Sequence, residues 1–126
     1  MKKTIIIVLS GFLIACTPQA ASSELTLSSE DDSYKYYQGD VVLSGTFETK
    51  GSFGGDLDCL ILDEASKQIV PPLLTELLRE PYVCFSEDSV EVQAADGDQL
   101  ELRIDSLDLM YRETAGNSWI NVVEAL

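Results

Sequence analysis

The sequence predicts a mainly β domain, a small and strongly curved antiparallel sheet of five to six strands with one short helix. Three observations predict it. Apolar and polar residues alternate through residues 41–48, as in a half-buried strand. Glycine- and aspartate-rich turns separate further short apolar runs. The apolar phase also slips by one residue within residues 100–111, as expected where a strand bends.

The first two strands are joined by a glycine-rich turn. Val41, Leu43 and Phe47 share one face of the first strand, and polar residues share the other. Residues 50–55 form the turn. Residues 57–62 form the second strand, whose centre is apolar on both faces and is therefore expected to be buried on both sides.

A short helix is expected at residues 71–81. Pro71 and Pro72 suit its first positions, and Pro81 ends it. Leucines recur between them at helical spacing: Leu73, Leu74, Leu77 and Leu78. We expect this leucine face to cap one end of the β core.

Two short strands are expected next, at residues 82–86 and 89–94, followed by a turn at residues 96–98. A long strand comes after the turn. Its apolar residues first alternate as Leu100, Leu102 and Ile104, and then as Leu107, Leu109 and Tyr111. A β-bulge near Asp105 and Ser106 explains the slip without exposing half of the leucines. The last strand is residues 119–125, with Ile120 and Val122 on one face.

The order of these elements is similar to that of OB-like β-barrels found in small envelope lipoproteins. The resemblance covers residues 39–126, and the helix comes earlier in the chain than in the usual OB order. It implies a curled sheet or barrel. The resemblance carries no ligand-binding residues over to this chain.

The N-terminus has the pattern of an export signal. Lys2 and Lys3 precede an apolar run that is too short to cross a bilayer as a helix. The run ends in Leu13-Ile14-Ala15-Cys16, which resembles the lipobox of bacterial lipoproteins. The resemblance implies that residues 1–15 are a signal peptide and that Cys16 carries the lipid. The alternative is an ordinary signal peptide with a chance cysteine.

The lipobox also implies an address in the bacterial cell envelope. Several acyl chains would anchor the protein to a membrane without spanning it. In the lipoprotein family an aspartate after the cysteine tends to retain the protein at the inner membrane, and Thr17 stands at that position here. In a host with two membranes we therefore expect the outer one, with the domain facing the periplasm.

A flexible acidic tether is expected between lipid and domain. We assign residues 16–35 to the lipidated cysteine and this tether, and residues 36–126 to the β-rich domain. The tether is poor in large apolar residues and rich in serine and acidic residues. Residues 30–32 form an acidic run that could bind calcium, but such runs in linkers are usually solvated.

The chain is strongly acidic, with a formal net charge of −14. Removal of residues 1–15 takes away Lys2 and Lys3 and leaves 6 − 22 = −16. Such a surface repels nucleic acids and anionic lipid head groups, so we expect no nucleic-acid partner. Contact with the membrane is expected through the N-terminal lipid alone. The charge serves either solubility or the binding of a basic envelope protein.

Two cysteines remain after Cys16. Cys59 and Cys84 are an even pair in an exported protein, and we expect them to form a disulfide. The alternative, a redox-active pair, lacks the close Cys-x-x-Cys spacing.

The residues favour a protein without catalytic activity. The chain has no histidine, which removes the commonest general base and nucleophile systems. Asp56 with Asp58, and Asp96 with Asp98, could serve as acid and base or bind calcium, but each pair lies beside glycines where solvated turn aspartates are expected. We therefore expect no catalytic residue, metal or cofactor.

Aromatic residues are the candidates for partner binding. Tyr34, Tyr36 and Tyr37 cluster where the tether meets the domain. Tyrosine is a common anchor at interfaces, so this group could dock a basic protein. The alternative is that the tyrosines cover the open end of the barrel. Trp119 is expected in the core.

Two classes of function follow. The favoured one is a membrane-anchored envelope lipoprotein with a non-catalytic binding or scaffolding β domain. The alternative is an acidic inhibitor or immunity-type protein that neutralises a basic enzyme such as a muramidase. An enzyme or small-ligand carrier would need a pocket that the sequence does not reveal.

Overall fold

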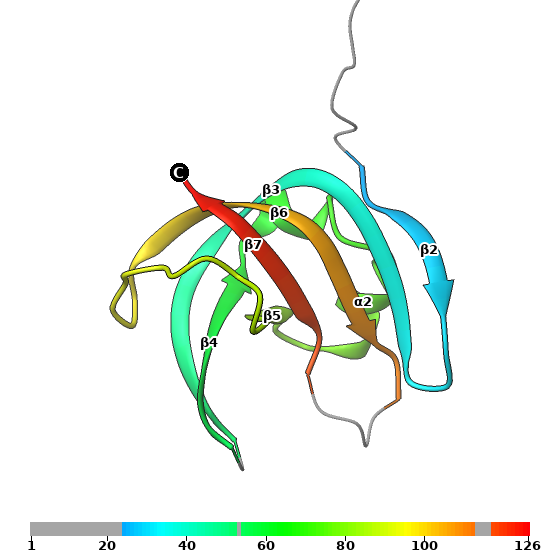
Figure 1. Ribbon diagram of the computed structural model, residues 1–126, viewed down its shortest axis with the longest axis horizontal. Coiled ribbons are helices and arrows are strands. Elements are labelled where there is room, and N and C mark those ends of the chain that lie inside the picture. Colours follow the sequence, from blue (N-terminus) through cyan, green and yellow to red (C-terminus); the bar gives the residue numbers. More distant parts are fainter. Residues whose placement is uncertain (1–23, 53, 113–116) are drawn as a thin grey trace, which may run out of the picture.

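The computed structural model describes residues 24–52, 54–112 and 117–126, which form one curved sheet with two short helices (Figure 1). The strands are β2 (Thr26–Glu30), β3 (Tyr34–Ser52), β4 (Gly55–Leu62), β5 (Tyr82–Phe85), β6 (Gln99–Met110) and β7 (Trp119–Ala125), and the helices are α1 (Glu64–Lys67) and α2 (Pro72–Leu77). The predicted mainly β class is confirmed.

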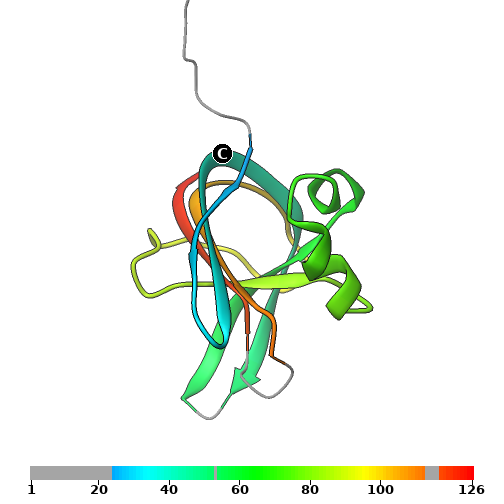
Figure 2. The same ribbon diagram turned by 90° about the vertical axis from the view of Figure 1, so that its right-hand side faces the viewer.

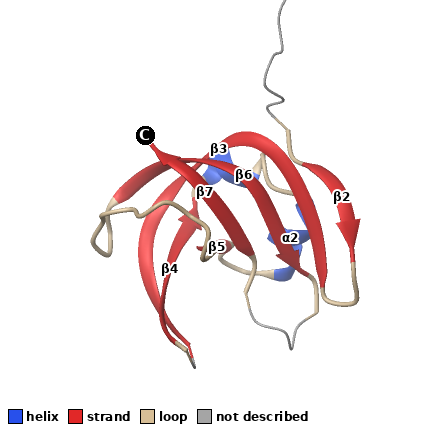
Figure 3. Cartoon of the chain, viewed as in Figure 1, coloured by secondary structure: helices blue, strands red, loops and turns tan. Residues whose placement is uncertain are grey.

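The sheet curls into a near-ring. Its strand order is β2-β3-β4-β5-β7-β6, and an additional pairing between β3 and β6 joins the two sides (Figures 1 and 3). Strand β3 makes this possible because it is long enough to use its first part on β6 and its last part on β4. The pairings are antiparallel except for β5 with β7, which is parallel, whereas the sequence predicted an antiparallel sheet.

Strand β3 bends where its backbone is crowded. Its register on β6 shifts between Gln38 and Val41. A Cβ on Gly39 would lie 2.1 Å from the carbonyl oxygen of Glu24, and a Cβ on Gly45 would lie 1.9 Å from that of Ile61. Glycine is therefore required at both positions because other backbone segments approach them closely.

The predicted bulge in β6 is confirmed. The register between β6 and β7 shifts between Ile104 and Ser106, so Asp105 is the extra residue. Leu102 and Ile104 are buried before it, and Leu107 and Leu109 are buried after it. The slip in apolar phase thus keeps all four side chains in one core.

The core fills the interior of the ring, and each end is covered by chain. The central buried side chains come from every strand except β2, and Val70 and Leu74 join them from the helical segment. The two helices lie on one side of the ring, and residues 86–98, which we call the crossing loop, pass on the other side (Figure 2). Val92 of this loop packs against the core. Leu73, Leu74 and Leu78 thus form the expected leucine cap, whereas Leu77 is exposed.

The helical segment differs from the prediction, because α2 already ends at Leu77, before Pro81, and a second helix precedes it. Helix α2 lies within the predicted residues 71–81, and α1 was not predicted. Asp63 caps α1, because its Oδ1 accepts the backbone N–H of Ser66 at 2.9 Å. Its Oδ2 accepts the hydroxyl of Ser44 on β3 at 2.6 Å. The Ser44 bond above all lowers the pKa of Asp63. This cap fastens α1 to β3.

Two expectations about chain segments differ from the structure. The strand predicted at residues 89–94 is absent; these residues belong to the crossing loop, in which the Val90 N–H donates to the Val122 carbonyl at 2.9 Å. The ordered sheet also begins before the predicted residue 36, because β2 pairs with residues 35–38 of β3 inside the range expected to be tether. Strand β2 is exposed along its whole length, so its composition resembles a linker although its backbone is paired.

Candidate functional site

The three candidate tyrosines all lie on β3, but on different faces. The rings of Tyr34 and Tyr36 stack with centroids 6.0 Å apart. Tyr37 lies opposite Leu107 of β6 and packs against the core. Neighbouring residues of a strand point to opposite faces. The structure therefore brings two of the three tyrosines together on the outer face and places Tyr37 on the inner one.

Cross-strand pairing extends the two outer tyrosines into a surface. Tyr36 lies opposite Asp108 of β6, which in turn lies opposite Trp119 of β7. Tyr34 lies opposite Met110. Directly opposed residues share a face, and all five are half-buried. We call these five residues the aromatic patch; Trp119, expected in the core, belongs to this outer surface.

Asp31, in the turn between β2 and β3, fixes one side of the aromatic patch. Its Oδ2 accepts the hydroxyl of Tyr36 at 2.7 Å, and its Oδ1 accepts the backbone N–H groups of Ser33 and Tyr34, each at 2.8 Å. The Tyr36 bond and then the two backbone bonds lower the pKa of Asp31. The same contact raises the pKa of Tyr36 to about 12. Near neutral pH, Asp31 is thus charged and Tyr36 keeps its proton.

Asp108 lies in the middle of the aromatic patch, between Tyr36 and Trp119. Burial raises the pKa of its carboxyl group. Among the residues that the structure describes, none forms a hydrogen bond or ion pair with this carboxylate. A partly desolvated carboxylate between aromatic rings is a favourable acceptor for an incoming Lys or Arg side chain.

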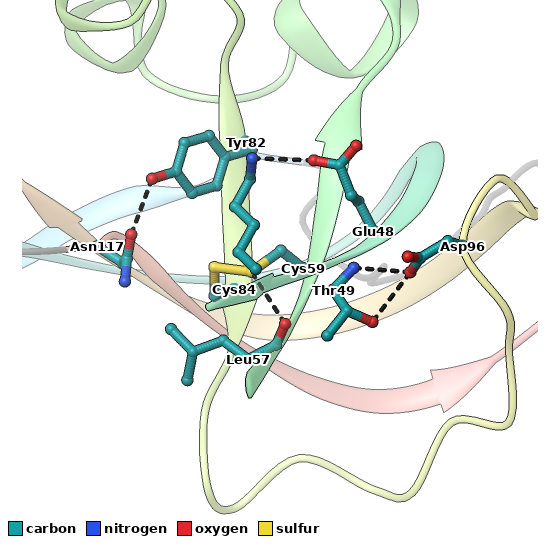
Figure 4. The surroundings of a disulfide bond; sticks show 9 residues. Glu48, Thr49, Leu57, Cys59, Tyr82, Cys84, Asp96 and Asn117 are labelled. Atoms are coloured by element: carbon teal, nitrogen blue, oxygen red, sulfur yellow. Dashed lines mark hydrogen bonds and ion pairs between the residues drawn. A yellow bond between two sulfur atoms is a disulfide. The ribbon is translucent and has the colours of Figure 1, made fainter. Parts of the chain in front are cut away.

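A hydrogen-bonded asparagine connects the aromatic patch to the disulfide region. The Tyr34 hydroxyl donates to the Asn117 carbonyl at 3.2 Å, and the Tyr82 hydroxyl donates to Asn117 Oδ1 at 2.8 Å. Figure 4 shows Asn117, Tyr82 and Glu48 around the disulfide. Lys50 lies 4.5 Å from the centroid of the Tyr82 ring and 2.9 Å from Glu48. This lysine is therefore already neutralised by a neighbour.

The predicted disulfide between Cys59 and Cys84 is confirmed. The two residues lie directly opposite each other on β4 and β5, and both are fully buried. Cys84 also lies beside Trp119 in the parallel pairing of β5 with β7. The bond thus holds the short strand β5 in place next to the aromatic patch, which fits a structural role.

The carboxylate pairs considered for catalysis are engaged in turns or exposed. Asp96 Oδ1 accepts the N–H and the hydroxyl of Thr49 at 2.8 and 2.9 Å, and Asp98 Oδ2 accepts the N–H of Ala95 at 2.9 Å. Asp56 and Asp58 are exposed on β4. No group of three or more potential metal ligands occurs within the described part of the chain.

Most basic side chains of the domain are close to carboxylates. Lys35, Lys50, Lys67 and Arg103 each lie within 4.0 Å of an Asp or Glu side chain. The chain therefore has a large surplus of carboxylates, among them Asp31 and Asp108, that none of its described lysines or arginines neutralises. These carboxylates face solvent or a partner.

The N-terminal predictions concern residues outside the described part. The signal peptide, the lipidation site Cys16 and residues 16–23 of the tether all precede residue 24, the first residue that the structure describes. Among the described residues, no helix is both long and apolar enough to span a bilayer.

Sequence reasoning missed Asp31 and Asp108 as members of the site. The alternation of β6 after its bulge did place Asp108 on the outer face, between Leu107 and Leu109. Nothing local shows that Tyr36 of β3 and Trp119 of β7 lie on either side of it, because that depends on the strand order and register.

Comparison with known proteins gives no relative. No protein-family model, no curated protein and no solved structure matches this chain.

Proposed function

We propose that this protein is a lipid-anchored lipoprotein of the bacterial envelope whose β domain binds or scaffolds another envelope component without catalysing a reaction. The lipobox-like Leu13-Ile14-Ala15-Cys16 supports the anchor, and the confirmed disulfide fits an exported protein. The aromatic patch is the surface that we assign to the partner.

The observation that carries this proposal is the position of Asp108. Its carboxylate lies half-buried between Tyr36 and Trp119, and no described residue neutralises it. Asp31 adds a second carboxylate beside Tyr36 at 2.7 Å. A Lys or Arg side chain of a partner would gain charge-assisted hydrogen bonds and contact with aromatic faces at the same place. The partner is accordingly a protein with a basic surface.

A second candidate function follows from the charge alone. A formal charge of −16 after removal of residues 1–15 suits an inhibitor or immunity-type protein that neutralises a basic enzyme such as a muramidase. Long-range charge attraction would dominate in that case. A scaffold that uses the aromatic patch would rely more on short-range contact.

Crosslinking from the aromatic patch tests the proposal. A photoreactive phenylalanine analogue replaces Tyr34 in the full chain, expressed in its native envelope, and the captured protein is identified by mass spectrometry. Capture is carried out at about 0.1 M and about 1 M NaCl, where the Debye length is roughly 10 and 3 Å. A structural envelope protein retained at high salt supports the scaffold, whereas a basic enzyme captured only at low salt supports the inhibitor.

Matched variants make this experiment specific for the patch. Asp108→Asn removes the central carboxylate, and Glu101→Gln removes one charge from an exposed position on the same strand. We expect the first variant to lose most of the capture and the second to keep it. Equal capture by both variants, or equal capture from an analogue at Glu76 of α2, would contradict a partner site at the aromatic patch.

A labelled fatty acid tests the anchor. Label should enter the full chain in its host and be absent from Cys16→Ser, which has no thiol to modify. Label in both proteins would rule out Cys16 as the lipidation site.

A further inference from the structure

One edge of the sheet is only partly covered. Strand β4 pairs with β3 along its whole length, Gly55–Leu62, but with β5 only at Cys59–Ile61. In the described part of the chain, no strand pairs with residues 56–58 on the side that faces β5, whose last residue, Phe85, follows Cys84, the partner of Cys59. The β3–β4 hairpin projects beyond the ring at this point (Figures 1 and 2).

The main chain of this edge is oriented for pairing. The N–H of Leu62 donates to the Pro81 carbonyl at 3.0 Å, so it points toward the β5 side. Alternate residues of a strand direct their N–H groups to the same edge. The N–H groups of Asp56 and Asp58 therefore point to the uncovered part of this edge.

The crossing loop forms the opposite wall and is held at both ends. On β7, the Ile120 carbonyl accepts the Ser86 N–H at 2.8 Å. At the other end of the loop, Gly97 donates its N–H to the carbonyl of Phe47 on β3 at 2.9 Å. Val92 packs against the core between these anchors. The wall is thus pre-organised before any partner binds.

Between the edge of β4 and the crossing loop lies a groove of about 350 Å³. Its lining combines carboxylates and apolar side chains and contains no Lys or Arg: Asp56, Leu57, Asp58, Phe85, Ser86, Ser89, Val90, Glu91 and Val92. The three carboxylates complement a basic ligand, and the apolar side chains complement its aliphatic parts.

We propose that this groove, which we call the β4 groove, binds an extended basic segment of a partner protein that adds to the edge of β4 as a further strand. Main-chain hydrogen bonds to Asp56 and Asp58 would align the segment, and the carboxylates would select lysine or arginine at alternate positions. The inference rests on the proposed function, since it assumes a basic protein partner, and it adds a site distinct from the aromatic patch.

A direct binding measurement tests this inference. The probe is a fluorescent peptide that alternates lysine and valine, and the control peptide alternates glutamate and valine. Each has roughly ten residues, the upper end of usual strand lengths. Both are titrated into the full chain, purified in detergent from its host. We expect saturable binding of the lysine peptide alone, with amide NMR shifts centred on Asp56, Asp58 and Val92.

Charge-matched variants locate the site. Asp56→Asn/Asp58→Asn should weaken the affinity for the lysine peptide on the order of tenfold. Glu76→Gln/Glu80→Gln removes the same charge from exposed positions in and just after α2, on the other side of the ring, and should leave the affinity unchanged. Equal weakening by both double variants would mean that only the total charge matters, and would overturn the β4 groove.

A second pair of variants isolates the main-chain bond. Asp56→Ala and Asp56→Pro both lose the carboxylate, but only proline loses the N–H that points into the groove. We expect the proline variant to bind about fivefold more weakly than the alanine variant, as for one lost hydrogen bond. Equal affinities would exclude strand addition.

The outcomes separate this inference from the proposed function. The binding site in the β4 groove is overturned if the lysine peptide does not bind, or if it shifts only the amide signals of Tyr36 and Trp119. Capture through Tyr34 still tests the proposed partner in that case. Loss of capture together with normal peptide binding would instead reject the proposed partner site on the aromatic patch.

Discussion

At the level of single residues, the outer face of the ring holds two carboxylates in opposite electrostatic surroundings. Hydrogen bonds from Tyr36 and from backbone N–H groups lower the pKa of Asp31. Burial raises the pKa of Asp108, which has no such donors among the described residues. Asp31 is therefore satisfied within the fold, whereas Asp108 gains more from a cation supplied by a partner.

Replacing Asp108 should stabilise the fold in a pH-dependent manner. A carboxyl group whose folded pKa is raised binds its proton more tightly in the folded state, so its ionisation opposes folding as the pH rises through the folded pKa. Asp108→Asn should therefore raise the melting temperature near neutral pH and lose this advantage below the ordinary aspartate pKa of about 3.9. Glu101→Gln is the control for charge. A gain that persists at acid pH would contradict this explanation.

Adding a methyl group to Gly45 should destabilise the fold strongly. Its Cβ would lie 1.9 Å from the Ile61 carbonyl oxygen, which is backbone of a paired strand and cannot move away easily. We expect Gly45→Ala to lower the free energy of unfolding by about 3 kcal/mol, at the upper end for overpacking. Gly51→Ala, whose Cβ would meet nothing within 4 Å, is the matched control in urea unfolding. Similar losses in both variants would rule out the crowding argument.

At the level of elements, one long strand and one short strand decide the architecture. Strand β3, with 19 residues, takes part in both sides of the ring, and its register on β6 shifts between Gln38 and Val41. Strand β5 has only 4 residues, pairs with β4 over three of them and carries Cys84. A strand of this length contributes few ladder bonds, so the disulfide is an important part of its attachment.

Removing the disulfide should lower stability substantially. The bond closes a loop with a sequence separation of 25 residues, for which the chain-entropy estimate is roughly 3 kcal/mol. We expect Cys59→Ala/Cys84→Ala to lower the free energy of unfolding by that amount, which appears as a lower urea midpoint. Addition of reductant to the original chain should approach the same midpoint and leave the variant unchanged. An unchanged midpoint in the variant would show that β5 is held by packing alone.

The elements also show where sequence patterns succeed. The bulge at Asp105 was predictable because a one-residue slip in a period-two pattern indicates an inserted residue in the strand. Helix α1 was missed because its four residues are too few to display a period, and only the cap at Asp63 marks it. Residues 89–94 alternate like a strand, yet no neighbouring edge pairs with them as a ladder in the described structure.

At the level of the whole molecule, a near-ring covered at both ends carries a large negative charge. The helices cover one end and the crossing loop the other (Figure 2). Most described lysines and arginines are paired with carboxylates, so the remaining acidic side chains repel one another across the surface.

Salt should therefore stabilise this protein. With a formal charge of −14 for the whole chain, we expect the melting temperature to rise between ~0.01 M and ~1 M NaCl, as the Debye length falls from roughly 30 to 3 Å. Glu76→Gln/Glu80→Gln/Glu87→Gln, which removes exposed acidic charge, should reduce this increase. A fall in melting temperature with salt would show that the surface ion pairs outweigh the repulsion.

The sequence by itself determined the β class, the apolar faces of the long strands, the bulge and the disulfide partners, because each depends on local alternation or on the two cysteines that lie within the domain. Only the tertiary structure decided that β5 and β7 run parallel, that β2 joins the sheet, and that Tyr34 and Tyr36 separate from Tyr37. Strand order and register set these features. They bring Tyr36, Asp108 and Trp119 together from distant parts of the chain, and no local pattern records such a contact.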